Sequence, residues 1–320
     1  MKNRNRFKFC HTNMKIVFMG TPDYAAVTLE RLLKTNHEIA GVFAQPDKKV
    51  GRKQILTPPP VKVVALENNI PVFQPDTLRD GEALKILKEI NPDIIVVVAY
   101  GKILPEEILN LPKFGCVNGH ASLLPKYRGA SPIQWCIVCG EKVTGVTVMQ
   151  MDKGMDTGDI LTQEEVVIGE NETAEQLFDR LAVISAELMI KTIDNIENIT
   201  PESQNEAEAT YAPIIKKEMA LLDFSKPAET LFNEIRGYYS WPCAYFFLGG
   251  KRVKVITASV GGSTNKQAGT VVGNDDCLEI ACGDGNTLKL LTLQPEGKGQ
   301  MTAKQMLCGN KIEKGYVING

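Results

Sequence analysis

An amide, an imidazole and a carboxylate stand in this chain at positions from which they could act on one reacting carbon. They belong to Asn118, His120 and Asp156. Asn118 and His120 are two residues apart on a stretch that reads as a strand entering a loop, so their side chains project to the same side of a sheet. That spacing favours a shared substrate atom.

Acyl-type transfer to an amine is the chemistry that such a set supports. Its tetrahedral intermediate needs hydrogen-bond donors aimed at the developing oxyanion and a route for the proton. Asn118 can donate through its amide, and His120 can donate when protonated. Asp156 can hold the imidazole ring and stabilise its charged form, as a carboxylate does in a hydrolase triad. The protein then needs no covalent nucleophile.

The same residues also fit plainer interpretations. An Asn-x-His pair can arise where the histidine hydrogen-bonds a neighbouring carbonyl and serves only the fold. Residues 152–159, which include Asp156, alternate Asp and Gly like a metal loop but lack the further ligands and terminal Glu of a calcium-binding hand. We therefore expect no metal.

The elements that must position these residues alternate between short β-branched runs and helical patterns. That alternation is typical of an α/β, Rossmann-like, mostly parallel sheet with helices on both faces, whose site lies at the strand ends. Strands are expected at residues 16–19, 38–43, 72–74 and 94–99, and helices at 25–33, 61–68 and 81–90.

The second half of the chain changes character. A helix over residues 174–193 closes the first domain, and a polar, acidic stretch follows it. Beyond a helix over 228–236, short strands broken by Gly and Asn predict a small β-barrel. We therefore divide the chain into an N-terminal extension, expected to be disordered, a catalytic domain, a linker and a C-terminal domain, at residues 1–13, 14–194, 195–212 and 213–320.

Composition narrows the class of protein. The chain has 320 residues, 43% of them apolar, and a formal net charge of -2, which predicts ordinary globular domains. The first 13 residues contain no apolar run, so we expect neither a secretory signal nor a membrane anchor, and a cytoplasmic location. The eight cysteines are then expected to be reduced, with Cys136 and Cys139 buried in an apolar helix rather than bound to zinc.

Three further segments invite functional interpretation. Residues 20–23 follow the first strand, where a dinucleotide fold carries its glycine fingerprint, but G-x-G-x-x-G is absent, so no NAD is expected. Residues 47–53 carry four positive charges against one negative, which fits a solvated loop or a phosphate-binding one. The aromatic block at 236–242 could stack bases, although core packing is the interpretation we favour.

As a whole, the chain resembles the methionyl-tRNA branch of the 10-formyltetrahydrofolate-dependent formyltransferases, from Met14 nearly to the C-terminus. Asn-x-His followed by Ser-Leu-Leu-Pro and a later Asp marks the wider family. The other matching blocks favour the tRNA branch, and all of them lie at residues 18–25, 45–47, 58–62, 98–101, 118–129 and 145–152.

The resemblance implies roles for the site. Asn118, His120 and Asp156 would be the catalytic residues. The formyl donor would be 10-formyltetrahydrofolate as a cosubstrate, and the acceptor would be the α-amine of initiator methionyl-tRNA, whose formylated form starts translation. The folate site would be lined by Ser122, Leu123, Leu124 and Pro125.

The resemblance also implies contacts with tRNA. The loop over residues 47–53 would contact the acceptor end, mainly through Arg52 with Lys49 and Lys53 beside it, and the C-terminal barrel would be an OB-like tRNA-binding domain. A monomer is expected.

Three alternatives stay open: the same chemistry on a small amine, a non-catalytic folate- or RNA-binding module, and hydrolysis of the folate donor. The basic loop and the second domain argue against the first alternative, and the intact catalytic set argues against the second.

Overall fold

The computed structural model describes residues 13–51, 53–309 and 312–318. The N-terminal extension up to residue 12, and with it the prediction of disorder, lies outside the described residues, as does Arg52. The chain forms two compact units. The first comprises residues 1–128, 145–165 and 179–210, and the second comprises 129–144, 166–178 and 211–320.

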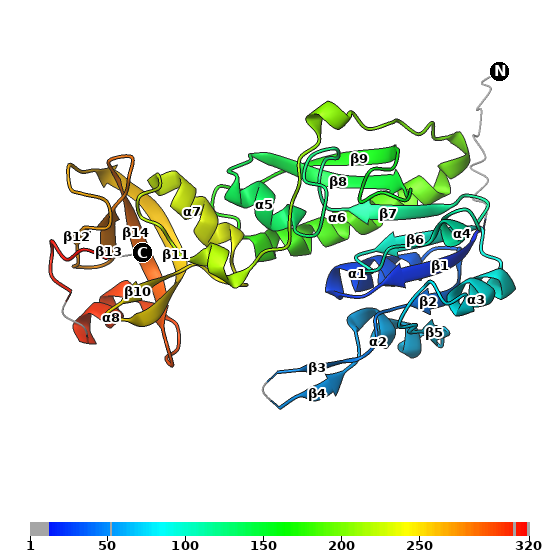
Figure 1. Cartoon of the computed structure of the whole chain (residues 1–320), viewed down its shortest axis with the longest axis horizontal. Coiled ribbons are helices and arrows are strands. Elements are labelled where there is room, and N and C mark those ends of the chain that lie inside the picture. Colours follow the sequence, from blue (N-terminus) through cyan, green and yellow to red (C-terminus); the bar gives the residue numbers. More distant parts are fainter. Residues whose placement is uncertain (1–12, 52, 310–311, 319–320) are drawn as a thin grey trace, which may run out of the picture. The chain divides into compact units, whose positions relative to one another are not determined.

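A seven-stranded sheet is the frame of the first unit (Figure 1). Its order is β5-β2-β1-β6-β7-β8-β9, parallel from β5 to β7 and antiparallel between β7 and β8. This confirms the predicted mostly parallel sheet. The strands are β1 (Lys15–Gly20), β2 (Glu38–Phe43), β5 (Val72–Phe73), β6 (Ile94–Val98), β7 (Cys116–His120), β8 (Val143–Gln150) and β9 (Ile160–Val167).

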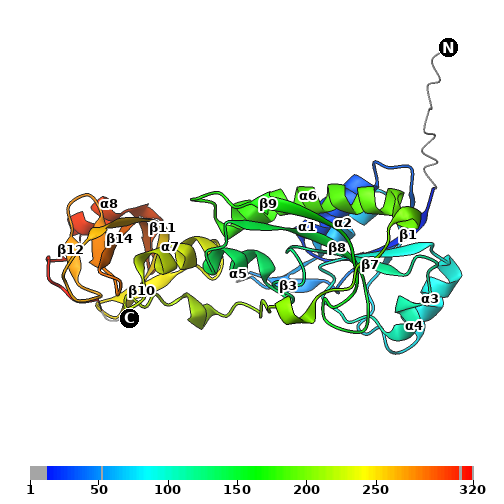
Figure 2. The ribbon, with the colours of Figure 1, turned by 90° about the horizontal axis from the view of Figure 1, so that it is seen from above.

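Helices cover both faces of this sheet, as predicted. Val17 and Met19 alternate along β1 and pack in one apolar cluster with α3 (Glu82–Ile90) and α4 (Glu106–Leu109). On the opposite face lies α6 (Ala174–Asp194), on the other side of the strands from α3 and α4 (Figure 2). The period-two alternation of a strand places each side chain against one helical layer or the other.

This unit also contains the α-helices α1 (Asp23–Leu32) and α2 (Pro60–Glu67) and the short 3-10 helices Ile196–Asn198 and Glu206–Glu208. Tyr24 of α1 donates a hydrogen bond from its hydroxyl to the Leu181 carbonyl of α6, so α1 shares the face of α6. A two-stranded sheet, β3 (Lys48–Val50) with β4 (Ile55–Thr57), stands where the sequence predicted a loop.

The second unit contains an antiparallel six-stranded curled sheet, which confirms the predicted OB-like domain. Its core includes Phe224, Phe246 and Leu290. Its strands are β10 (Tyr245–Leu248), β11 (Lys251–Ser263), β12 (Val271–Gly273), β13 (Leu278–Ala281), β14 (Asn286–Pro295) and β15 (Met301–Thr302). The α-helices α5 (Pro132–Val138), α7 (Ala228–Gly237) and α8 (Ala303–Gly309) accompany them. Within the described ranges, no helix is long and apolar enough to cross a membrane.

Candidate active site

Asn118 and His120 lie in β7, where the strand approaches the carboxyl edge of the parallel sheet. Gly119 between them faces α6, because a Cβ there would lie 3.0 Å from the Ser185 hydroxyl and 3.3 Å from the Met189 methyl. Asn118 and His120 therefore project from the opposite face, as their spacing predicted. Glycine is the residue that lets α6 pack this closely behind the pair.

The Asn118 side chain is half-buried, and its amide has no hydrogen-bond partner among the residues that the structure describes. An amide that is already partly out of water and not engaged by the protein is suited to bind a ligand oxygen. Asn118 is thus a ready donor at this face of the sheet.

The His120 ring is buried and contacts an acceptor at each nitrogen. Nε2 lies 2.9 Å from the Tyr127 carbonyl oxygen, and Nδ1 lies 3.6 Å from a carboxylate oxygen of Asp156. Because a carbonyl oxygen only accepts, Nε2 carries the proton toward Tyr127, and in the neutral ring Nδ1 is then the nitrogen with a lone pair that could accept a proton. The structure therefore contains both the carbonyl bond of the plainer interpretation and the neighbouring carboxylate of the catalytic one.

Asp156 stands on a loop with little freedom. Its φ is +55°, in the left-handed region. The Asp152 carboxylate accepts from the Gly154 N–H at 2.9 Å and the Thr157 hydroxyl at 2.7 Å. A Cβ on Gly158 would lie 1.7 Å from the Gln150 carbonyl oxygen. The alternating Asp and Gly residues that resembled a metal loop thus build a tight turn around Asp156.

The loop over residues 122–125 is fixed largely by its own hydrogen bonds. Ser122 and Leu124 are buried, and the Ser122 hydroxyl donates to the Lys126 carbonyl at 2.6 Å. The Leu124 N–H donates to the Thr147 hydroxyl, and its carbonyl accepts from Gln163 at 2.8 Å. Leu123 and Pro125 are half-buried, so these two side chains are the ones left to line a ligand.

Sequence reasoning assigned no role to Arg128 and Gln204, which the structure brings beside this site. Arg128 is fully buried, and its guanidinium donates to the Gln204 side-chain oxygen at 3.1 and 2.8 Å. The Gln204 amide nitrogen in turn donates to the backbone carbonyls of Asp156 and Gly158. A polar residue 48 positions beyond Asp156 gives no signal of this contact in the sequence.

Two of the three predicted tRNA contacts lie on the hairpin of β3 and β4. Lys49 and Lys53 are exposed there. Asp47, the one acidic residue of the segment, accepts from Lys62 at 2.8 Å, and this bond lowers the pKa of Asp47. Its charge is therefore offset by a lysine outside the segment, and the hairpin keeps its positive character.

Two other predictions have mixed outcomes. Arg236 and Tyr238 of the aromatic block are buried, as core packing requires, whereas Trp241 is 53% exposed.

Cys136 is buried in α5, which raises the pKa of its thiol to about 12, but Cys139 caps that helix and is exposed. The prediction that both cysteines are buried was wrong for Cys139, because the helix ends one residue before it.

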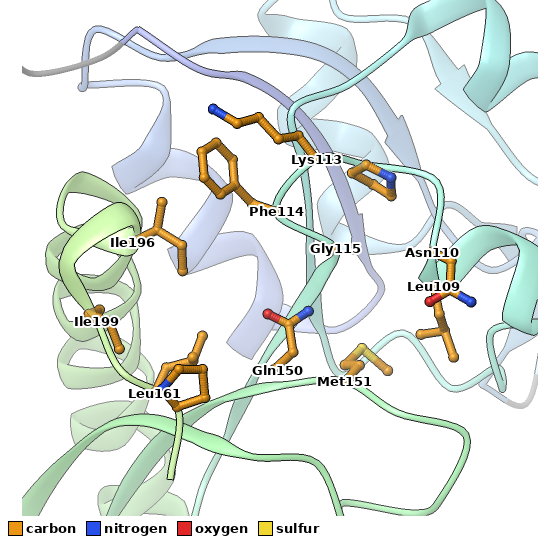
Figure 3. Close-up of a pocket in the computed structure, with 12 residues that line it drawn as sticks. Leu109, Asn110, Lys113, Phe114, Gly115, Gln150, Met151, Leu161, Ile196 and Ile199 are labelled. Carbon is orange, nitrogen blue, oxygen red and sulfur yellow. The ribbon is translucent and has the colours of Figure 1, made fainter.

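A separate hollow of about 440 Å³ opens at the other end of β7 (Figure 3). Gly115, Gln150 and Met151 contribute to its lining, and the Gln150 amide donates to the Cys116 carbonyl at 3.0 Å. Among the described residues that line it there is neither a histidine nor a carboxylate. The hollow shares no residue with the predicted site, and the ionisable side chain among the described residues that line it is that of Lys113.

Two family models match the chain. One is described as "Formyl transferase" and matches residues 14–193, and the other is described as "Formyl transferase, C-terminal domain" and matches residues 214–311. The class that the fold and the site define is therefore a formyltransferase with its accompanying second domain.

Curated relatives narrow this class. The methionyl-tRNA formyltransferase of Alkaliphilus oremlandii is 49% identical over 309 residues, which cover 95% of this chain and 99% of the relative. The methionyl-tRNA formyltransferase of Geobacter metallireducens is 44% identical, over 94% of this chain and 97% of the relative. The chain belongs to the methionyl-tRNA formyltransferase family, as its motifs predicted.

A solved structure shares the fold at lower identity. The N-formyltransferase from Helicobacter canadensis, solved in complex with folinic acid and dTDP-3-aminofucose, is 22% identical, with a TM-score of 0.67 over 88% of this chain and 99% of that chain. At this identity the likeness concerns the fold alone.

Proposed function

We propose that this chain transfers the formyl group of 10-formyltetrahydrofolate to the free amino group of initiator methionyl-tRNA. The observation that carries the proposal is the 49% identity to a methionyl-tRNA formyltransferase over nearly the whole of both chains. The arrangement of Asn118, His120 and Asp156 supplies a chemical reason, because it offers one unengaged amide donor and one proton-exchanging nitrogen beside a carboxylate.

In the proposed reaction, the α-amine nitrogen of the methionyl group attacks the formyl carbon. Asn118 donates to the oxyanion of the tetrahedral intermediate, a contribution typically worth about 3 kcal/mol. His120, held by Tyr127 and Asp156, takes the proton from the attacking nitrogen and delivers it to the folate nitrogen as the carbon–nitrogen bond to folate breaks. The products are formylmethionyl-tRNA and tetrahydrofolate.

Binding of the donor is assigned to Ser122, Leu123, Leu124 and Pro125. The internal hydrogen bonds of this loop support different roles for its residues. Ser122 and Leu124 fix the loop conformation. The half-buried side chains of Leu123 and Pro125 contact the folate. A loop whose polar groups are already satisfied presents a firm apolar edge to a heterocycle.

Binding of tRNA is assigned to the hairpin of β3 and β4 and to the OB-like second domain. The exposed Lys49 and Lys53, with Arg52 between them in the sequence, are suited to phosphates, which long flexible cations contact without reading sequence. The domain boundaries at residues 194 and 213, the monomeric state and the cytoplasmic location stay predictions.

The test is formyl transfer by the purified full chain, with initiator methionyl-tRNA compared with free methionine, an amino sugar and a no-acceptor control. Rapid formylation of the tRNA alone supports the proposal. Consumption of the folate donor only in the presence of the amino sugar would instead identify a small amine as the formyl acceptor. Equal consumption without any acceptor would identify a hydrolase.

A further inference from the structure

Residues 202–210, which the sequence predicts to be part of a linker, hydrogen-bond to two loops of the first unit. At the start of this 202–210 segment, Glu202 exchanges backbone hydrogen bonds of 2.7 and 2.9 Å with Ile160. The Ser203 hydroxyl then donates to the Asp159 carboxylate at 2.9 Å. The segment is therefore laid along the end of the loop that carries Asp156.

Gln204 makes the contact nearest to the site. Its amide nitrogen donates to the Asp156 carbonyl at 2.9 Å and to the Gly158 carbonyl at 2.7 Å. Its amide oxygen accepts from the buried Arg128 at 3.1 and 2.8 Å. The amide nitrogen of Gln204 thus bonds to the backbone on both sides of residue 157, while its oxygen is held by a buried guanidinium.

The other end of the 202–210 segment holds the second loop. The Thr210 hydroxyl accepts from the Tyr127 N–H at 2.9 Å, and the Thr210 carbonyl accepts from the Arg128 N–H at 2.8 Å. The Tyr127 carbonyl is the acceptor for His120 Nε2. One segment therefore holds the backbone of both residues that flank the His120 ring.

Both of those residues have left-handed backbone conformations, with φ of +55° at Asp156 and +60° at Tyr127. For residues other than glycine this region costs free energy and persists where surrounding contacts over-determine it. The hydrogen bonds from Gln204 and Thr210 are contacts of that kind. Removing the hydrogen bonds of Gln204 would let the Asp156 loop relax and move the Asp156 carboxylate away from His120. Removing the hydrogen bond of Thr210 would do the same for the Tyr127 carbonyl.

We propose that Gln204 is a positioning residue for the formyl-transfer site, acting through the backbone of Asp156. The inference rests on the proposed function, because that function makes His120 and Asp156 catalytic. Gln204 itself contacts no reacting atom. It sets the distance between the Asp156 carboxylate and His120 Nδ1.

The sharpest variant is Gln204→Glu. It keeps the oxygen that accepts from Arg128 and removes both N–H donors to the Asp156 loop, while the half-buried position tolerates the charge beside the guanidinium. Ser203→Ala is the matched control, because it removes a hydrogen bond from the same segment to the Asp159 side chain. Gln204→Leu is the second variant, without a charge, should Gln204→Glu fold poorly.

We expect Gln204→Glu to lower kcat by about tenfold to hundredfold, the usual effect of a catalytic group displaced by about 1 Å. The KM values for folate and tRNA and the Ser203→Ala kinetics should stay near wild type. In an Asp156→Asn background, Gln204→Glu should add little further loss, since both changes act on the same carboxylate. Equal losses in both backgrounds, or a kcat unchanged by Gln204→Glu, would overturn the inference.

A second readout does not depend on activity. The chain has three histidines, so the ring signals of His120 can be assigned by NMR in the full protein. They should shift in Gln204→Glu and stay in place in Ser203→Ala. If the wild-type protein failed to formylate methionyl-tRNA, the proposed function would be wrong, but the His120 signals would still test the positioning role of Gln204. His120 signals in Gln204→Glu that are identical to those of wild type would overturn the positioning role.

Discussion

Replacing Arg128 with methionine should lower the stability of the first unit by about 2 kcal/mol, the usual net contribution of hydrogen bonds made by a charged group. The Arg128 side chain is 0% exposed, and its guanidinium makes two hydrogen bonds to the Gln204 oxygen, at 3.1 and 2.8 Å. Methionine keeps the unbranched stem and its packing but not the guanidinium. The loss is therefore one of hydrogen bonds rather than of volume.

Glu206 should respond differently although it bonds to the same guanidinium, at 2.9 and 2.7 Å. Its side chain is 70% exposed, so water can solvate the carboxylate when the partner is gone. Glu206→Gln should consequently leave the stability nearly unchanged. The double variant Arg128→Met with Glu206→Gln should match Arg128→Met alone.

Thermal unfolding measures the difference. A loss of about 2 kcal/mol corresponds to a fall in Tm of about 4–8 °C for a unit of this size. Hydrogen exchange in β7 localises the effect to the first unit. The fluorescence of Trp135 and Trp241 serves as the internal control, because both tryptophans lie in the second unit. Equal losses for Arg128→Met and Glu206→Gln would refute the reasoning from exposure.

The Arg128 guanidinium also lowers the pKa of Glu206. A carboxyl group with a lowered folded pKa stabilises the fold above its ordinary value of 4.5, and this contribution disappears as the pH falls through the folded value. Wild type should therefore lose slightly more stability than Arg128→Met on acidification below pH 4.5, and the difference should be small because the Glu206 carboxylate is 70% exposed. Parallel stability curves for the two proteins would contradict this coupling.

Three other perturbations have separate readouts. Asn118→Ala should lower kcat by about 10²- to 10³-fold with little change in Tm, because it removes the proposed oxyanion donor, whose amide makes no hydrogen bond to the described residues. Wild-type turnover at saturation would remove Asn118 from catalysis. Lys49→Ala with Lys53→Ala should raise KM for tRNA and flatten its salt dependence while the KM for folate stays constant; an unchanged salt slope would contradict the phosphate contacts. Burial raises the pKa of Glu234, so its contribution to stability falls as the pH rises above 4.5, and Glu234→Gln should flatten the fall in stability toward pH 8 measured by urea unfolding; a slope as steep as that of wild type would count against this origin.

The sheet could be predicted from the sequence because its strands are short β-branched runs of the right length. Within the predicted run over residues 94–99, β6 spans Ile94–Val98, and every one of its residues is buried, as a strand covered on both faces requires; Ala99 lies beyond the strand and is exposed. The placement of Asn118 and His120 on one face followed from period-two alternation alone, since β7 extends through both residues. These features depend on local sequence.

The hairpin of β3 and β4 could not be predicted in this way. Each strand has three residues, too few to show a period, and Val50 and Ile55 are more than half exposed, so no buried face marks them. The grouping of residues 129–144 and 166–178 with the C-terminal part is also invisible locally, because it depends on contacts between distant segments.

The 202–210 segment shows why composition could not separate a tether from a structural element. In a linker, successive polar residues hydrogen-bond to water. In the 202–210 segment, successive polar residues hydrogen-bond to other parts of the protein. Gln204 and Thr210 bond to partners 48 and 83 residues away, beyond any local pattern. What distinguishes the two cases is where each donor and acceptor finds its partner. In this chain those partners lie at the backbone of Asp156 and Tyr127, so the stretch that reads as the least functional in sequence supports both sides of His120.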